Sequence, residues 1–336
     1  MASNLLLAPE IQLSYDRRLL QRFRTNTVFN KFGVQKSIPA RGGVALSFRK
    51  MEIIRPVATA STTTWTSPDS TYTDGSARLL TEGTFYTPTV IASWAEVTAT
   101  VRQYGQAAYI SDLDINQALD PQISSYVDNF SESMTELLDI VTRDVLLAAT
   151  TIQYANAKAS ASAIISGDFI NLLEFRKAVR TLKGKNAKPV EDGKFVALVN
   201  PDSMFDLQGD SNITNVWVNG GAGAKQSDIF NASFKDLPHG IRLYESTIVP
   251  ISRASGYGDV YNTFVLGAEA YGTIKLDTMP AKIITHMPGS SGVSDPLDQV
   301  ATVGWKANHV AVILNQSNMV LIKHQTSAYT GTRAGL

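Results

Sequence analysis

The chain has 336 residues, which is enough for one large domain or for two to three smaller ones that share a core. Its apolar content of 44% and charged content of 18% are those of a folded protein with few surface charges, and uncharged surface is the easier kind to dehydrate on association. The absence of cysteine excludes disulfide bonds, thiolate catalysis and cysteine-ligated metal sites.

The net charge of zero conceals an uneven distribution of charge along the chain. Residues 1–55 carry ten Lys and Arg against three acidic residues, and residues 56–164 carry four against twelve. This order favours self-association, in which the basic segment of one copy lies on the acidic surface of a neighbour. A basic segment that touches nucleic acid, or one that is only solvated, are the alternatives.

The N-terminal residues indicate where the protein is made and predict an extended arm. They lack the basic segment of a secretory leader, and no apolar run reaches the roughly 18 residues that span a bilayer, so we expect synthesis in a cytoplasm and no membrane segment. In the first forty residues apolar side chains are scattered among arginines, which predicts an arm with one short helix near residues 15–23. Alternation over residues 44–48 then predicts a half-buried strand.

A polar segment interrupts the strands that follow. Eleven of the eighteen positions in residues 59–76 are Ser or Thr, too few apolar groups to build a core. Alternation resumes at residues 97–102, and strands on both sides of a polar segment are typical of a long projecting loop. A disordered linker is the alternative.

Residues 120–154 carry the clearest helical pattern in the chain. Asp120 and Pro121 suit an N-cap and a first helical position, and apolar residues then recur every three or four positions. The predicted helix is roughly 50 Å long at 1.5 Å per residue, and its apolar face is expected to brace a sheet. Four acidic residues are expected on its exposed side, as a solvated face or as a docking strip for a basic arm: Asp128, Glu132, Glu136 and Asp139.

Short elements alternate after a connection of small residues at 155–163. Asp168 is expected to cap a helix that runs to Leu182. Further strands and one short helix are expected at 194–199, 201–207 (the helix), 241–244, 263–266, 272–276 and 282–285, with a glycine-rich loop at 219–224. This mixture predicts an α+β architecture.

Residues 295–322 are expected to form a β-hairpin. Two apolar runs, 310–314 and 319–322, flank the turn-favouring sequence Asn-Gln-Ser-Asn at 315–318.

Motifs for catalysis or metal binding are missing from the sequence. None of the four histidines lies four residues from another, so there is no helical zinc pair. The segment that begins at Asp112 fails the calcium-loop pattern at its sixth and twelfth positions, and the glycines at 220–223 lack phosphate-loop spacing. We therefore expect no metal, no cofactor and no enzyme activity.

Four short sequence motifs occur in the same order as in a known protein family. They are Leu-Thr-Glu-Gly at 80–83, Gln-Tyr-Gly at 103–105, Ile-Ser-Asp at 110–112 and DPLDQVATVGWKA at 295–307. This series resembles the major capsid proteins of tailed bacteriophages, which have the Hong Kong 97-type fold. The resemblance implies an N-terminal arm (1–41), an extended loop with supporting strands (42–110), a peripheral domain (111–165 and 282–336) with a spine helix at 120–154, and an axial domain (166–281).

The family also implies a function. Such a protein self-assembles as hexamers and pentamers into the icosahedral shell around a double-stranded DNA genome, is assembled in the host cytoplasm and ends in the virion. The implied partners are other copies of the chain, a scaffolding protein, a portal, a decoration protein and packaged DNA touched without sequence specificity, with no membrane. A nanocompartment shell of the same fold is the main alternative, and an enzyme or a sugar-binding virion protein is the alternative from another class.

The candidate interface residues fall into three groups. Arm arginines would contact an acidic neighbour or the scaffold, loop aromatics would anchor the loop on a neighbour, and helix carboxylates would receive a basic arm. They are Arg17, Arg18, Arg22 and Arg24; Trp65 and Tyr72; and Asp128, Glu132 and Glu136.

Overall fold

The computed structural model describes residues 28–39, 43–50, 82–83, 95–117, 122–211, 236–237, 239–254, 258–276, 281–290 and 296–328. The chain divides into two units, one made of Ser47–Thr98 and the other of Met1–Leu46 with Ala99–Leu336. Strands β2 (Ala45–Lys50) and β3 (Ala95–Thr100) pair with each other in a two-stranded sheet. These strands confirm the predicted strands near residues 44–48 and 97–102, while the polar segment between them lies outside the described residues.

A sheet of five strands forms one half of the larger unit. In spatial order its strands are β1 (Val34–Ile38), β11 (Tyr271–Leu276), β13 (Val300–Ile313) and β12 (Lys282–His286), with β4 (Arg102–Ser111) also paired to β13. Residues 300–309 of the long strand β13 lie beside β4, and residues 310–313 lie beside β11. Every second residue of β13 from Ala301 to Ala311 is buried, so one face of the sheet faces a core.

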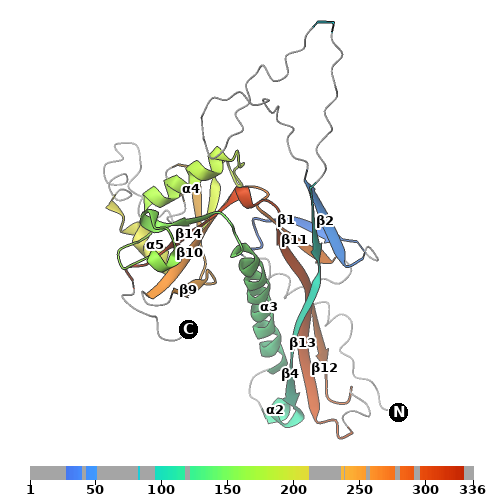
Figure 1. Ribbon diagram of the computed structural model, residues 1–336. Helices are drawn as coiled ribbons and strands as arrows, with labels where there is room; N and C mark the ends of the chain where they lie inside the picture. Colours follow the sequence, from blue (N-terminus) through green and yellow to red (C-terminus); the bar gives the residue numbers. More distant parts are fainter. Residues whose placement is uncertain are drawn as a thin grey trace. The chain divides into compact units, whose positions relative to one another are not determined.

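Helix α3 (Gln122–Leu146) covers that face, after the short helix α2 (Asp112–Gln117) (Figure 1). The predicted phase is confirmed in its first half, where Val127, Phe130 and Met134 are buried. They pack against Val303 and Trp305 of β13, so the helix braces the sheet as predicted. The start of the predicted helix, residues 120–121, lies outside the described residues.

The predicted end of the helix at residue 154 is wrong. The helix ends at Leu146, and strand β5 (Ile152–Tyr154) pairs in parallel with the strand formed by residues 319–324. The apolar spacing that continues to Ile152 is typical of a helix, but three residues of a strand fit it as well. Two 3₁₀ helices follow, η2 (Ala155–Ala157) and η3 (Ala161–Ala163).

A sheet of seven strands forms the other half of the larger unit. In spatial order its strands are β5, β14 (Met319–His324), β10 (Gly258–Leu266), β6 (Phe195–Val199), β8 (Ile241–Glu245) and β7 (Asp236–Leu237), with β9 (Ile251–Ala254) paired to β10. All five residues of β6 are buried, as expected for a strand that is covered on both faces. The strands predicted between residues 194 and 285 and the short helix α5 (Pro201–Gln208) are confirmed, while the predicted glycine-rich loop at 219–224 lies outside the described residues.

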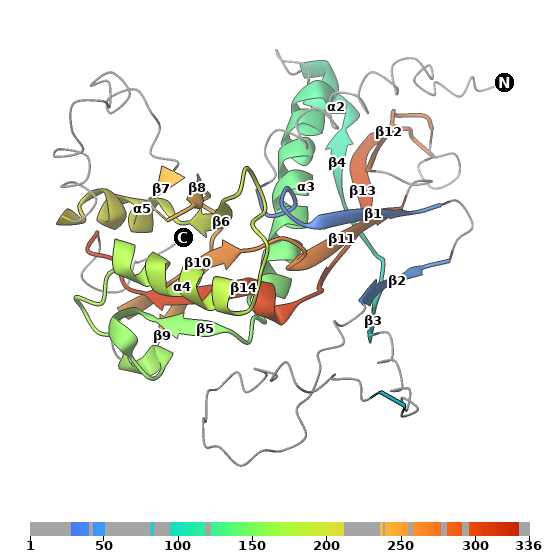
Figure 2. The ribbon, with the colours of Figure 1, turned by 90° about the horizontal axis from the view of Figure 1, so that it is seen from above.

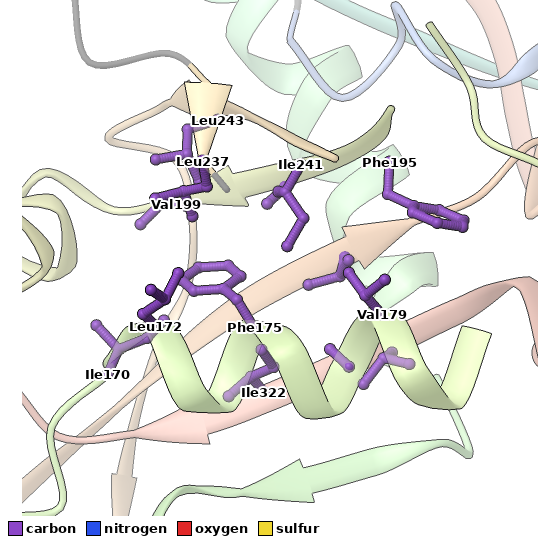
Figure 3. Packing of buried hydrophobic residues seen from close by; sticks show 14 of the residues in the cluster. Ile170, Leu172, Phe175, Val179, Phe195, Val199, Leu237, Ile241, Leu243 and Ile322 are labelled. Carbon is purple, nitrogen blue, oxygen red and sulfur yellow. The ribbon is translucent and has the colours of Figure 1, made fainter. Parts of the chain in front are cut away.

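Helix α4 (Leu172–Gly184) covers one face of this sheet (Figure 2). Its buried residues Phe175 and Val179 point into the core that Val199 and Ile241 line from the sheet (Figure 3). The N-cap is Asn171, whose side chain accepts a hydrogen bond from Glu174 N at 3.1 Å. The prediction that Asp168 caps this helix is wrong, because its buried carboxylate accepts hydrogen bonds from Ile165 N and Asn156 Nδ2 instead.

The predicted hairpin at residues 295–322 is also wrong. Strand β13 pairs with β4, β11 and β12, whereas β14 pairs with β5 and β10 in the other sheet. The connection contains the 3₁₀ helix η5 (Gln316–Asn318), and the Gln316 side chain joins it to Thr150 N and Ala148 O. The chain therefore turns where predicted, but it passes from one sheet to the other, since a local pattern of apolar runs does not choose the partner of a strand.

Candidate interaction surfaces

The start of the described chain is fixed to α3 through one carboxylate. Asp139 accepts hydrogen bonds from Val28 N at 2.9 Å, Phe29 N at 3.2 Å and Asn30 N at 3.2 Å, and from Asn30 Nδ2 at 3.0 Å. Four donors on one carboxylate match its lone-pair capacity. We call residues Val28–Lys31, of which the first three donate to this carboxylate, the arm anchor.

Further buried polar groups surround the arm anchor. The Thr142 hydroxyl lies 2.6 Å from Asn30 Oδ1 and 3.0 Å from His309 Nε2, and the Tyr271 hydroxyl donates to Phe29 O. Burial raises the pKa of Asp139, while its hydrogen bonds from the three backbone N–H groups act in the opposite direction. Burial lowers the pKa of His309 to about 4, so its ring is neutral at pH 7.

The prediction that Asp139 lies on the exposed side of the helix is wrong, since only 1% of this residue is exposed. The second half of α3 packs against the arm anchor as well as against the sheet, which widens its buried face. In the sequence, polar residues at helical spacing beside the apolar stripe indicate this wider buried face. They are Ser131, Thr135, Asp139 and Thr142, all buried.

The other three predicted carboxylates of α3 form an acidic strip. Asp128 is half-buried, Glu132 and Glu136 are exposed, and successive members are four positions apart in the sequence. Residues four apart lie on one helical face, so the strip follows the helix axis. The structure thus brings these three candidate residues together on one surface.

The remaining predicted interface residues lie outside the described part of the chain. They are Arg17, Arg18, Arg22 and Arg24 of the arm, and Trp65 and Tyr72 of the polar loop. Their roles stay predictions.

Three exposed apolar residues that sequence reasoning missed lie on adjoining segments near one end of the five-stranded sheet. Tyr109 on β4 is 79% exposed, Leu113 on α2 is 60% exposed, and Leu297, just before β13, is 75% exposed. Tyr109 pairs with Thr302 of β13, and Asp112 N donates to Gln299 O at 2.9 Å, which ties the three segments together. We call these three residues the apolar tip. Clustered exposed apolar side chains, unlike single ones, mark interaction sites.

A hollow of about 730 Å³ lies beside α4 in the larger unit. Arg176, Arg180 and Lys183 of α4 line it with His239, and Val179 and Phe195 contribute apolar surface. Asp192, Gly193, His239 and Gly240 have positive φ angles of 48°, 74°, 79° and 78°, so two tight turns meet at its rim. We call this hollow the basic groove. Because its lining residues come from segments far apart in sequence, no local motif indicated it.

The described ranges contain no group of three or more His, Asp or Glu side chains placed to hold a metal ion. Among the helices in the described part of the chain, none has the length and apolar content to cross a bilayer. The notable surfaces are therefore a charged strip, a charged groove and an apolar tip.

Comparison with known proteins identifies the family. A family model described as phage capsid protein matches residues 94–321, well over half of the chain, and the chain therefore belongs to the phage capsid protein family. It is a structural protein of a bacteriophage virion, and the resemblance to the major capsid proteins of tailed phages is confirmed. No match was found among curated protein sequences.

Solved structures agree on the fold. The chain is similar to the capsid asymmetric unit of cyanophage Pam1, with a TM-score of 0.66 and 12% identity over 92% of this chain and 93% of that one. It is similar to the capsid of Ralstonia phage GP4 (TM-score 0.62, 12% identity, 90% and 89% covered) and to that of cyanophage P-SCSP1u (0.60, 17% identity, 90% and 89%). The predicted Hong Kong 97-type fold is confirmed.

Proposed function

We propose that this protein is the major capsid protein whose hexamers and pentamers form the icosahedral shell around the double-stranded DNA genome of a tailed bacteriophage. The observation that carries the proposal is the match of residues 94–321 to the phage capsid family. The chain also aligns with about nine-tenths of the length of the chains in two solved capsid structures. The function then lies in contacts between copies. We expect no catalytic activity.

The parts of the chain take roles in this shell. We assign residues 1–41 to an arm, 42–110 to an extended loop with its strands, 111–165 and 282–336 to the peripheral domain, and 166–281 to the axial domain. Several strands cross these assignments. By sequence β5 and β14 belong to the peripheral segments, but they pair in the sheet of β6 and β10, whereas β11 belongs to the axial segment and pairs with β13.

Many weak contacts suit such a shell better than a few strong ones. Heterologous contacts between identical copies close into rings and shells, and weak contacts allow a misplaced subunit to leave. The apolar tip is one candidate contact, because it exposes three large apolar side chains at one end of a sheet. Trp65 and Tyr72 of the loop are candidates for anchoring it on a neighbouring subunit.

The arm arginines are proposed to contact an acidic neighbouring subunit or a scaffolding protein. DNA at the inner wall would be touched only through phosphate charge. Changing Arg17, Arg18, Arg22 and Arg24 together to Gln is expected to impair assembly before DNA is packaged. Normal empty shells that fail to fill with DNA would instead favour a nucleic-acid role. A portal and a decoration protein are the other proposed partners.

Electron microscopy of negatively stained purified protein tests the proposal. Uniform icosahedral shells are expected, and their absence under conditions that keep the protein folded would count against it. A nanocompartment shell would form similar particles but would carry a co-purified enzyme, so mass spectrometry of the particles separates the two functions.

A further inference from the structure

We propose that the basic groove of one copy binds the acidic strip of a second copy of this chain. The inference rests on the capsid function proposed above and names one of the contacts that would build the shell. It joins two surfaces, the hollow beside α4 and the acidic strip of α3.

The cations of the groove are held in place by the core beneath them. Phe175, Val179 and Leu182 of α4 are buried against the seven-stranded sheet, so the helix is fixed in rotation (Figure 3). Arg176, Arg180 and Lys183 are the exposed residues of the same turns. Within the described part of the chain, none of these three side chains forms an ion pair, whereas the neighbouring Lys177 binds Glu174 at 2.7 Å.

The acidic strip has a matching geometry. The first and last carboxylates of the strip are eight positions apart along α3, and the first and last of the three cations are seven positions apart along α4. At a rise of 1.5 Å per residue, the two rows of charge are about 12 Å and about 10 Å long. Three carboxylates on one rigid helix can therefore face three cations on another, each with a partner of opposite charge. The hollow leaves room for the carboxylate ends to enter beside α4.

The two surfaces belong to different parts of the larger unit. Helix α3 packs on the five-stranded sheet and α4 on the seven-stranded sheet, and the two helices lie apart in both views (Figures 1 and 2). The acidic strip of one copy can therefore contact the basic groove of another copy. Such a contact is heterologous, since different patches meet, and repeated heterologous contacts close into rings. Exposed ion pairs are individually weak and are screened by salt, so the contact should be reversible and sensitive to ionic strength.

Charge reversal on each side tests the contact. The groove variant is R176E/R180E/K183E and the strip variant is D128K/E132K/E136K. Each alone is expected to raise the protein concentration needed for association at least tenfold, as measured by sedimentation velocity at low salt. An equimolar mixture of the two variants, or all six changes in one chain, should restore association, because each reversed surface again meets its opposite. Circular dichroism and thermal unfolding check that each variant folds.

A matched control reverses three exposed cations outside the groove, in R102E/K188E/K282E. It carries the same change of net charge and is expected to associate nearly as the unmodified chain does. The inference would be overturned if the groove variant associated at the same protein concentration as the unmodified chain. It would also be overturned if mixing the two variants failed to restore association. Rescue of the strip variant by R17E/R18E/R22E/R24E instead of by the groove variant would overturn it as well, since the arm would then be the partner.

Sedimentation velocity measures association whether or not closed shells form. An unmodified chain that associates but forms no shells counts against the capsid function, while the pattern of recovery among the variants still decides the groove contact.

Discussion

Asn30 and Asp139, which lie 109 residues apart in the sequence, are joined by two hydrogen bonds to one carboxylate oxygen. Asn30 N donates to Asp139 Oδ1 at 3.2 Å, and Asn30 Nδ2 donates to the same oxygen at 3.0 Å. Val28 and Phe29 donate to the other oxygen. A single side chain of α3 therefore accepts hydrogen bonds from three successive residues where the N-terminal segment meets the body of the subunit.

The variant Asp139→Asn is expected to lower the free energy of unfolding by about 2–4 kcal/mol, because an amide NH₂ would face backbone N–H donors in a buried site. Urea unfolding of the unassembled subunit measures the loss. Amide hydrogen exchange at residues 28–30 should also become faster.

Glu136→Gln is the matched control, since Glu136 lies one turn away on the exposed face. It should change the free energy of unfolding by less than about 0.5 kcal/mol. Equal stability losses in the two variants would show that the carboxylate of Asp139 has no special role.

Stability should fall as the pH decreases from 6.5 to about 4. Burial lowers the pKa of His309 and of His324 to about 4, whereas in the unfolded chain each ring takes up a proton near pH 6.5. Between these values the unfolded state binds more protons, so the free energy of unfolding decreases by on the order of 3 kcal/mol for each histidine. Asp139 acts in the opposite direction at the acidic end, because its pKa is raised above 3.8.

Urea unfolding at a series of pH values measures this dependence. The double variant His309→Gln and His324→Gln should lose most of the slope between pH 6.5 and 4, while His286→Gln, at an exposed position, should keep it. An unchanged slope in the double variant would contradict the assignment to the two buried rings.

Replacing the apolar tip should weaken assembly and leave the subunit stable. Tyr109→Ser with Leu113→Ser and Leu297→Ser removes side chains that are 60–79% exposed, so the free energy of unfolding should change little. Light scattering during assembly is expected to show a higher threshold concentration. Phe205→Ser, at a residue 63% exposed on α5, is the control for loss of an exposed apolar group elsewhere. A normal threshold in the triple variant would exclude the tip as a contact.

Deletion of residues 60–76 should give a folded monomer that forms no shells. The deleted segment is polar and carries Trp65 and Tyr72, so we expect it to contribute to contacts with a neighbour and little to the core. Circular dichroism tests folding, and electron microscopy tests assembly. Normal particles from the deleted chain would contradict the proposed role of the loop.

Elements with strong periodicity could be predicted from the sequence. The first half of α3 and the buried strand β6 lie where apolar spacing placed them, because such spacing follows directly from the faces that a helix or strand buries. The order of four short words indicated the family. The acidic strip was also predicted, since residues four apart share a helical face whatever lies around it.

The predictions that proved wrong depended on contacts between segments far apart in the sequence. Strands β13 and β14 have the runs and turn of a hairpin, yet each finds its partners in a different sheet. Asp139 resembles its exposed neighbours in sequence, and only the arm anchor, more than a hundred residues earlier, explains its burial. The basic groove and the apolar tip each join residues from separate segments, so no window of the sequence contains them.

Cryo-electron microscopy at near-atomic resolution of particles formed by the purified chain is the most decisive test of the capsid function. We expect an icosahedral shell of hexamers and pentamers in which α3 braces the five-stranded sheet of every subunit and neighbouring copies meet through the arm, loop and tip. A folded protein that stays monomeric at every concentration and salt condition, or particles without icosahedral symmetry, would contradict it.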